Sequence, residues 1–190
     1  DLALALARRL DATLALGAYS RLLIDLNRPL DAPSSIPESS ERIPIPGNLG
    51  LSEGERARRI ERIFRPFHER VAALLDARRA AGRPTRLLTL HSFTPVYLGE
   101  RRPWVLGVLA GASRGLAERL LAELRRAAPD LPMALDEPYR VEADEDYAIP
   151  VHGDARGLDA LLIELRNDEL SDAGRVVAWA DRLAAALARI

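Results

Sequence analysis

The sequence predicts an α/β protein, a three-layer α/β/α sandwich on a mainly parallel or mixed sheet. Short apolar runs alternate along the chain with longer stretches of helical periodicity, which is typical of that class. Several of the apolar runs end in polar residues, as strands do where open α/β sheets bind their ligands. At 190 residues the chain is long enough to build one sizeable core, so we expect residues 1–190 to form a single domain.

The composition excludes several classes of function. The net charge of −1 gives no electrostatic basis for binding nucleic acid or an anionic membrane. There is no Cys, so disulfides, thiolate nucleophiles and Cys-bound zinc are excluded, and any metal must be held by His, Asp or Glu. No apolar stretch has the length of a membrane span, and no signal peptide is visible. We expect a cytoplasmic protein that binds a small molecule; a homo-oligomer is compatible with the sequence, which does not decide it.

The first 25 residues predict a helix followed by a strand. Residues 1–16 are apolar with charged residues on one side, and this helical pattern stops near Gly17. Residues 18–25 have the pattern of a strand. Because the chain begins at Asp1 inside a helical pattern, we expect an amino-terminal segment to precede it.

A long loop and a long helix follow. Residues 29–50 are rich in Pro, Ser, Gly and Asn, and such a loop in a compact domain is usually functional or disordered. Ser52 and Glu55 form a capping-box signature that opens a helix reaching about residue 81. Pro66 lies inside this pattern, so we expect a kink or a break there.

The second half of the chain alternates strands and helices. We expect strands over residues 86–90, 104–109, 131–135 and 159–166, helices over 113–128 and 171–188, and loops over 95–103 and 136–157. His91 closes the first of these strands. A His at that place is a candidate metal ligand or base, although a His after an apolar run is more often a structural residue.

Polar side chains end three of the expected strands: Asp25, Asn27 and Arg28; His91 and Ser92; Glu164, Arg166, Asn167 and Asp168. In a mainly parallel sheet these ends lie along one edge. A His, a carboxylate and an Arg together are the components of a metal-assisted hydrolase, in which the carboxylate activates water and the Arg binds a substrate carboxylate. The competing interpretation is structural: Glu164 and Arg166 form salt bridges with helices, and Arg28 anchors the Pro-rich loop.

Five motifs extend the argument by resemblance: Leu90-His-Ser-Phe-Thr-Pro95, Arg102-Pro-Trp104 before a Gly-Val strand, Glu137-Pro-Tyr139, His152-Gly-Asp-Ala-Arg-Gly157 and Ile163-Glu-Leu-Arg-Asn-Asp168. In this order they resemble the N-formylglutamate amidohydrolase family. Asp25-Leu-Asn-Arg28, with the His-Ser and Glu-Leu-Arg segments, is more distantly similar to zinc carboxypeptidases. The resemblance implies a phosphorylase/hydrolase-like fold, one zinc ion, and hydrolysis of N-formyl-L-glutamate to formate and glutamate, the last step in one bacterial route of histidine degradation.

The resemblance also implies roles for single residues. By resemblance, His91 is expected to be a zinc ligand, and Glu164 is expected to be the general base and proton shuttle. Asn27 and Arg28 are expected to bind a substrate carboxylate. Since the substrate has two carboxylates, a second Arg is expected, and the candidates are Arg102, Arg140, Arg156 and Arg166.

The remaining histidines are less clear. His152 lies between Gly-rich turns, where it would stabilise the oxyanion or donate a proton; the competing role is a hydrogen bond that anchors the loop. His68 lies on the long helix and is expected to be structural or exposed. The resemblance implies further metal ligands, a His and a nearby acidic or polar residue, in a segment expected upstream of Asp1. Without that segment a zinc site would have to recruit His68 or His152 or use carboxylates, or else the site is damaged.

The alternatives to an amidohydrolase are a carboxypeptidase-like or peptidoglycan-directed amidase with the same apparatus, and a carboxylate-binding relative without catalysis. An amidase for polymeric substrates requires an open groove, whereas a small N-acyl acidic amino acid requires a pocket lined with Arg.

Overall fold

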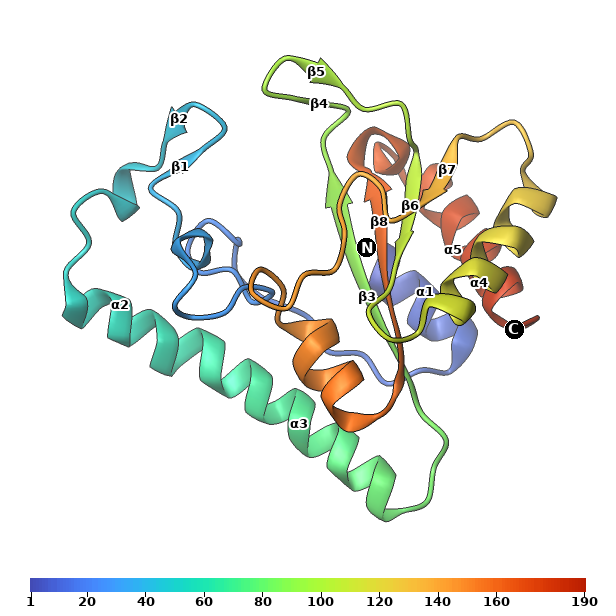
Figure 1. The fold of residues 1–190 in the computed structure, drawn as a ribbon, viewed down its shortest axis with the longest axis horizontal. Coiled ribbons are helices and arrows are strands. Elements are labelled where there is room, and N and C mark those ends of the chain that lie inside the picture. Colours follow the sequence, from blue (N-terminus) through green and yellow to red (C-terminus); the bar gives the residue numbers. More distant parts are fainter. The chain divides into compact units, whose positions relative to one another are not determined.

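A computed structural model describes all residues 1–190 (Figure 1). The chain divides into two compact units, each assembled from segments that are distant in sequence. The sheet unit contains residues 1–14, 87–141 and 159–190, and the loop unit contains residues 15–86 and 142–158. The single-domain expectation stays a prediction.

A mixed four-stranded sheet forms the centre of the sheet unit. Its strands are β3 (Arg86–Phe93), β8 (Asp159–Arg166), β6 (Leu106–Leu109) and β7 (Met133–Leu135), in that order across the sheet. β6 runs antiparallel to β8 and parallel to β7. The predicted α/β class with a mixed sheet is confirmed.

β3 and β8 are neighbours in this sheet. Thr89 of β3 contacts Leu161 of β8, and His91 contacts Glu164, so the contacts advance together along both strands. The two strands therefore run in the same direction, and their carboxyl ends lie at the same edge of the sheet (Figure 1).

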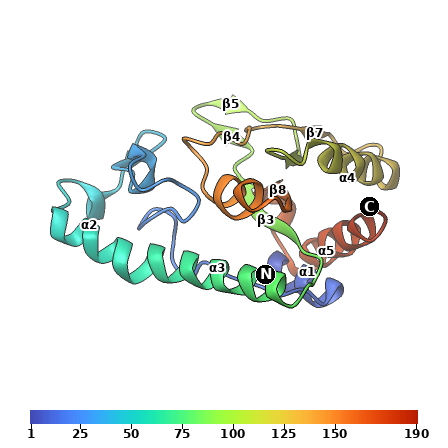
Figure 2. The same ribbon diagram turned by 60° about the horizontal axis from the view of Figure 1, so that its bottom comes forward.

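Three helices pack with the sheet: α1 (Leu2–Leu10), α4 (Arg114–Ala127) and α5 (Ala173–Leu187). α4 contacts β6, β7 and β8, and α5 packs against both α1 and α4 (Figures 1 and 2). Buried Leu, Val and Ile side chains of β6 and β8 meet the apolar faces of these helices in one core. Burial of apolar surface, at roughly 25 cal/mol per Å², is the main force that holds this arrangement together.

The ends of these helices differ in detail from the sequence-based expectations. α1 stops six residues early, because Asp11 adopts a left-handed conformation (φ 48°) that ends the helix before Gly17. Ser113 directly precedes α4, but its hydroxyl accepts a hydrogen bond from the Ala160 N–H of β8 at 2.9 Å and does not cap the helix. Asp172 caps α5 by accepting from the Arg175 N–H at 2.9 Å.

The long helix of the loop unit changes type along its length. α2 (Glu53–Arg59) continues into a π-helix (Ile60–Phe64) and then into α3 (Arg65–Ala80). Pro66 lies in the first turn of α3, where its missing N–H costs least, and the change of helix type directly precedes it. At the expected kink or break the helix continues through Pro66, and the irregularity is the π-helical stretch directly before it. The expected cap is confirmed: Ser52 Oγ accepts from the Glu55 N–H at 3.2 Å.

The strand expected over residues 18–25 is wrong. These residues form turns, and the Asp25 N–H bonds the Ser35 carbonyl inside the loop, not a sheet neighbour. The Pro-rich segment contains only a minimal hairpin of β1 (Ser39–Ser40) and β2 (Ile43–Pro44) between 3₁₀ turns.

Two buried residues hold this long loop in place. Arg59 donates to the carbonyls of Leu23 and Gly47 and to Asn48 Oδ1 at 2.7–2.9 Å. Asn48 donates in turn to the carbonyls of Leu22 and Pro37, both at 2.7 Å. Backbone carbonyls with no strand partner are thus satisfied by side chains, which gives the loop an ordered path.

The other loops contain short regular pieces. They are the hairpin β4 (Val96–Tyr97) and β5 (Glu100–Arg101), a π-helix (Ala148–Gly153), and 3₁₀ turns at Asp154–Arg156 and Asn167–Leu170. None of the helices combines the length and the apolar character that a membrane span requires.

Candidate active site

His91 and Glu164 lie side by side on neighbouring strands of the sheet unit. His91 Nδ1 is 3.8 Å from Glu164 Oε1. The Glu164 side chain is buried, with 8% of its surface exposed, whereas His91 retains 32%. A buried carboxylate next to a partly open imidazole is a usual arrangement for moving protons in a hydrolytic site. The structure thus brings together two of the residues that the sequence singled out.

The partner of Glu164 across the other edge of β8 is a glycine. Gly107 of β6 is in register with Glu164, and residues directly opposite each other in an antiparallel pair present the same face. The carbonyl oxygen of Glu137 occupies that face: a Cβ built on Gly107 would lie 1.7 Å from it. The loop that carries Glu137 therefore crosses the sheet beside the candidate carboxylate only because residue 107 has no side chain.

Arg102 is held by aromatic rings in the same unit. Its guanidinium carbon lies 4.5 Å from the Tyr97 ring centroid, 5.0 Å from that of Tyr139 and 5.8 Å from that of Phe93. It also donates to the Tyr139 hydroxyl at 2.8 Å. Stacking orients the planar cation and leaves it without a carboxylate partner among these contacts, which suits an anion-binding residue.

Arg166 has a different environment. Its Nη1 faces the carbonyl oxygens of Arg102, Pro103 and Trp104 at 3.2–3.4 Å, and its Nε donates to Asp168 at 2.8 Å. This hydrogen bond lowers the pKa of Asp168. The arginine is engaged in fastening the segment before β6 to the end of β8. Its expected role in substrate binding stays a prediction.

Asn27, in the loop unit, is buried, and both its side-chain oxygen and nitrogen are hydrogen-bonded. Its Nδ2 donates to Asp146 Oδ1 at 2.8 Å, and its Oδ1 accepts from the backbone N–H groups of Tyr147 and Ala148 at 3.3 and 2.9 Å. Its own N–H donates to Asp25 at 2.8 Å. The side chain therefore joins the two segments of this unit.

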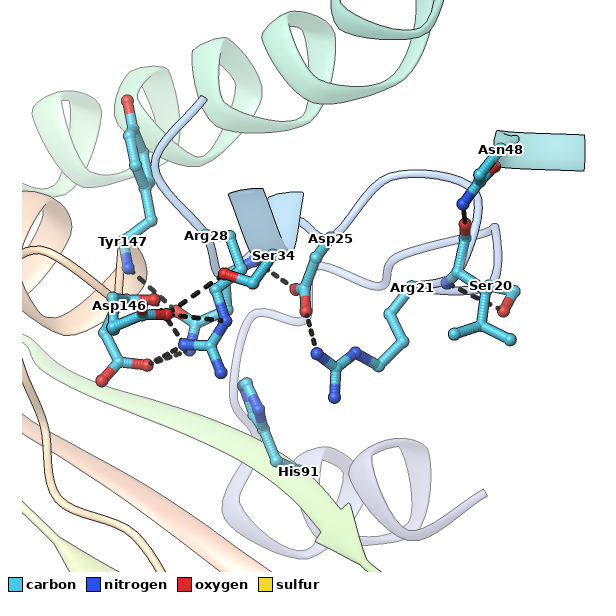
Figure 3. Close-up of polar contacts among 12 residues, drawn as sticks. Ser20, Arg21, Asp25, Arg28, Ser34, Asn48, His91, Asp146 and Tyr147 are labelled. Atoms are coloured by element: carbon cyan, nitrogen blue, oxygen red, sulfur yellow. Dashed lines mark hydrogen bonds and ion pairs between the residues drawn. The ribbon is translucent and has the colours of Figure 1, made fainter. Parts of the chain in front are cut away.

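Arg28 lies next to it and points at the same carboxylate (Figure 3). Its Nη1 donates to Asp146 Oδ1 at 3.1 Å and to the Glu145 carbonyl. Nε is buried and has no hydrogen-bond partner; the Glu145 carboxylate is 3.9 Å away. Arg28 is thus positioned by Asp146 and keeps one unused donor. Asp25, expected beside it, forms an ion pair with Arg21 at 2.8 Å (Figure 3).

His68 and His152 form a buried pair in the loop unit. His68 Nδ1 is 2.9 Å from His152 Nε2, and His68 Nε2 is 2.9 Å from the Leu26 carbonyl oxygen. Burial and then the neighbouring His152 lower the pKa of His68 to about 4. Burial and the charge of Arg156 lower the pKa of His152. Both imidazoles are therefore neutral near pH 7.

The pair corrects one expectation about the histidines. His68 is not exposed: it is 7% accessible, with the rings of Phe64 and Tyr147 both 4.3 Å away. Sequence reasoning treated it mainly as a structural or exposed residue because it has charged neighbours on the helix. The one available signal was its place on the apolar stripe, four residues after Phe64.

The other expected arginines have different surroundings. Arg156 pairs with Asp76 at 2.5 Å, and Arg140 is exposed. Of the three expected strand ends, those of β3 and β8 lie at one edge of the sheet, and the third does not exist because residues 18–25 do not form a strand.

A divalent metal was expected with His91 as a ligand. No three His, Asp or Glu side chains of the chain come together in a group that could hold a metal ion. A catalytic zinc site uses three protein ligands, so the assembled residues do not fit a complete zinc site. His91 would supply one ligand of such a site.

Comparisons with known proteins agree with the motifs. Residues 2–170 match the model of the N-formylglutamate amidohydrolase family. A gene product of Agrobacterium tumefaciens, known from its crystal structure, is 36% identical, with a TM-score of 0.91 over 99% of this chain and 75% of that one. N-formylglutamate amidohydrolase from Ralstonia eutropha shares the fold at 22% identity, with a TM-score of 0.65 over 99% of this chain and 78% of that one. No curated protein sequence matches. On the family match, which covers nearly the whole chain, this protein is a member of the N-formylglutamate amidohydrolase family.

Proposed function

We propose that the protein hydrolyses the amide of a small N-acyl acidic amino acid, with N-formyl-L-glutamate as the first candidate. The observation that carries this proposal is the pairing of His91 with a buried Glu164 at 3.8 Å on adjacent strands, in a chain of this family. With that substrate the products are formate and glutamate. Such a reaction would belong to the bacterial cytoplasm, where it would complete one route of histidine degradation.

Glu164 is the residue that we assign to proton transfer. A water oxygen attacks the formyl carbon while Glu164 accepts a proton from that water. The C–N bond then breaks, and the same proton passes from Glu164 to the departing nitrogen, which becomes the amine of glutamate.

Substrate carboxylates are assigned to arginines. Arg28 is oriented by Asp146 and retains an unused donor at Nε, and Asn27 fixes the adjacent backbone. Arg102, stacked between aromatic rings, is the second candidate. Arg166 remains a weaker candidate, since its donors are engaged with backbone carbonyls and Asp168. Two such cations would distinguish a dicarboxylate from a neutral amide.

Zinc enters this proposal through His91 as one ligand. The residues assembled in the chain do not complete a three-ligand site, so no step is assigned to the metal. Its presence is a question for elemental analysis of the purified protein, with a His91→Ala variant for comparison. Zinc near one equivalent that falls sharply in the variant supports His91 as a ligand; equal zinc in both proteins contradicts it.

The activity is tested by formate release from N-formyl-L-glutamate. We expect Glu164→Gln to reduce kcat by 10²-fold or more, on the order of the contribution of general acid–base catalysis, with little change in KM. Circular dichroism checks that the variant is folded. N-acetyl-L-glutamate and a dipeptide ending in Glu distinguish a deformylase from an amidase of wider range or a carboxypeptidase. Saturable binding of these compounds without turnover would favour a carboxylate-binding relative.

A further inference from the structure

The hydrogen-bond chain from His152 through His68 ends on a group that can only accept. His68 Nε2 lies 2.9 Å from the carbonyl oxygen of Leu26, which has no proton to give. His68 must therefore carry its proton on Nε2. In a neutral imidazole the other nitrogen is then an acceptor, so His68 Nδ1 has a lone pair directed at His152 Nε2, 2.9 Å away.

The same logic fixes the second ring. His152 Nε2 has to donate to His68 Nδ1, so the single proton of a neutral His152 is on Nε2. Its Nδ1 is left unprotonated. That atom is buried and has no hydrogen-bond partner, in a residue that is only 4% exposed. A buried nitrogen with an unused lone pair is costly and requires an explanation.

The surroundings keep both rings neutral and fixed. The two imidazoles are nearly parallel, with 18° between their planes and 5.2 Å between centroids, and the Tyr147 ring lies 5.9 Å from that of His152. Arg156 adds a nearby positive charge that opposes protonation of His152. His152 lies in a π-helix and His68 follows another, a backbone form that is frequent at functional sites.

We propose that His68 is a positioning residue that holds His152 as its Nε2–H tautomer, so that His152 acts through Nδ1 as a hydrogen-bond acceptor. This differs from a His152 that donates a proton or stabilises an oxyanion, since an unprotonated Nδ1 does neither. The catalytic part rests on the proposed function: the donor that Nδ1 accepts from is a polar N–H or O–H of the substrate complex. The tautomer itself does not depend on the substrate.

The tautomer is read by long-range ¹H–¹⁵N NMR on full-length protein labelled at histidine nitrogens, near pH 7. We expect His152 Nδ1 to resonate as an unprotonated nitrogen and Nε2 as a protonated one, with the same pattern for His68. His68→Leu removes the acceptor, so His152 should redistribute its proton. His68→Gln should restore the wild-type pattern, because its amide can accept from His152 and donate to Leu26. Phe67→Leu, beside His68 on α3, controls for lost packing.

The kinetic readout separates positioning from folding. In His68→Leu we expect kcat for formate release to fall about tenfold with KM nearly unchanged, and we expect His68→Gln to recover most of that loss. A protonated His152 Nδ1 in the wild type, or an unchanged tautomer in His68→Leu, overturns the proposal. Fixed tautomers without hydrolysis of any N-acyl amino acid would overturn the proposed function and the catalytic role, while the positioning by His68 would stand.

Discussion

Acidification should destabilise the protein through His68. In the unfolded chain this imidazole titrates near 6.5, whereas burial lowers its pKa to about 4 in the folded protein. Between these values the unfolded state binds more protons, so the free energy of unfolding falls as the pH falls. The stability that the neutral His68 contributes is fully present above pH 6.5 and is lost as the pH falls towards 4. At about 1.4 kcal/mol per pKa unit, the loss amounts to about 3 kcal/mol.

The measurement is urea unfolding at a series of pH values from 7.5 to 4.5, for the wild type and for His68→Gln. Circular dichroism at 222 nm is the suitable probe, because α3 carries His68 whereas both Trp residues lie in the sheet unit. Gln does not titrate, so the stability advantage of the wild type should shrink by about 1.4 kcal/mol per pH unit below pH 6. If the difference in the free energy of unfolding between wild type and His68→Gln stays constant from pH 7.5 to 4.5, the fold does not hold His68 neutral.

Two substitutions test the packing and capping of the sheet unit. Gly107→Ala should lower the free energy of unfolding by about 3 kcal/mol, because the new methyl group meets the Glu137 carbonyl. The control is Gly115→Ala on the exposed side of α4, which should be neutral or stabilising by about 0.5 kcal/mol. Similar changes at both sites in urea unfolding would refute the clash at Gly107. Asp172→Ala should cost about 1 kcal/mol by removing the cap of α5, and an unchanged thermal midpoint would argue against that cap.

The sequence predicted the elements whose local pattern and tertiary role agree. β8 is a continuous apolar run that is buried along nearly its whole length, and α4 has a clear apolar face; both were located within two residues. The end of α1 was missed because it depends on a left-handed Asp11, a conformation that non-glycine residues adopt only when the surroundings favour it.

The false strand at residues 18–25 has a different cause. Leu22, Leu23 and Ile24 form an apolar run that suits a strand and an irregular buried segment equally well. Ile24 is indeed buried, but it packs with Ile36 and Phe64 in the core of the loop unit. Side chains that bind the surrounding carbonyls, above all Arg59 and Asn48, replace a sheet ladder there. Their partners are 11–36 residues away in sequence, which periodicity does not detect.

The candidate site was predicted unevenly for the same reason. His91 and Glu164 were found because a polar residue at the end of an apolar run is visible in one short window. The His68–His152 contact joins residues 84 positions apart, and nothing in either local window indicates that two imidazoles share a hydrogen bond. Asn27 and Arg28 were singled out in the sequence as polar residues after an expected strand, yet their buried partner Asp146 lies in a loop of many acidic residues that looks solvated.

The motifs that identify the family also support one another around Glu164. Arg102 of the Arg-Pro-Trp segment donates to the hydroxyl of Tyr139, and the Glu137 carbonyl, two residues earlier, packs on Gly107. Gly107 is in register with Glu164, so this loop lies on the face from which the carboxylate projects. Arg166 then fastens the carbonyls of residues 102–104 to the end of β8. Residues that look like separate substrate-binding candidates in the sequence thus have a shared structural task, which is to build the wall beside the proposed general base. A substitution at Arg166 should therefore disturb Glu164 indirectly. A lower kcat in such a variant is then no evidence that Arg166 contacts the substrate; a raised KM with an unchanged kcat would be.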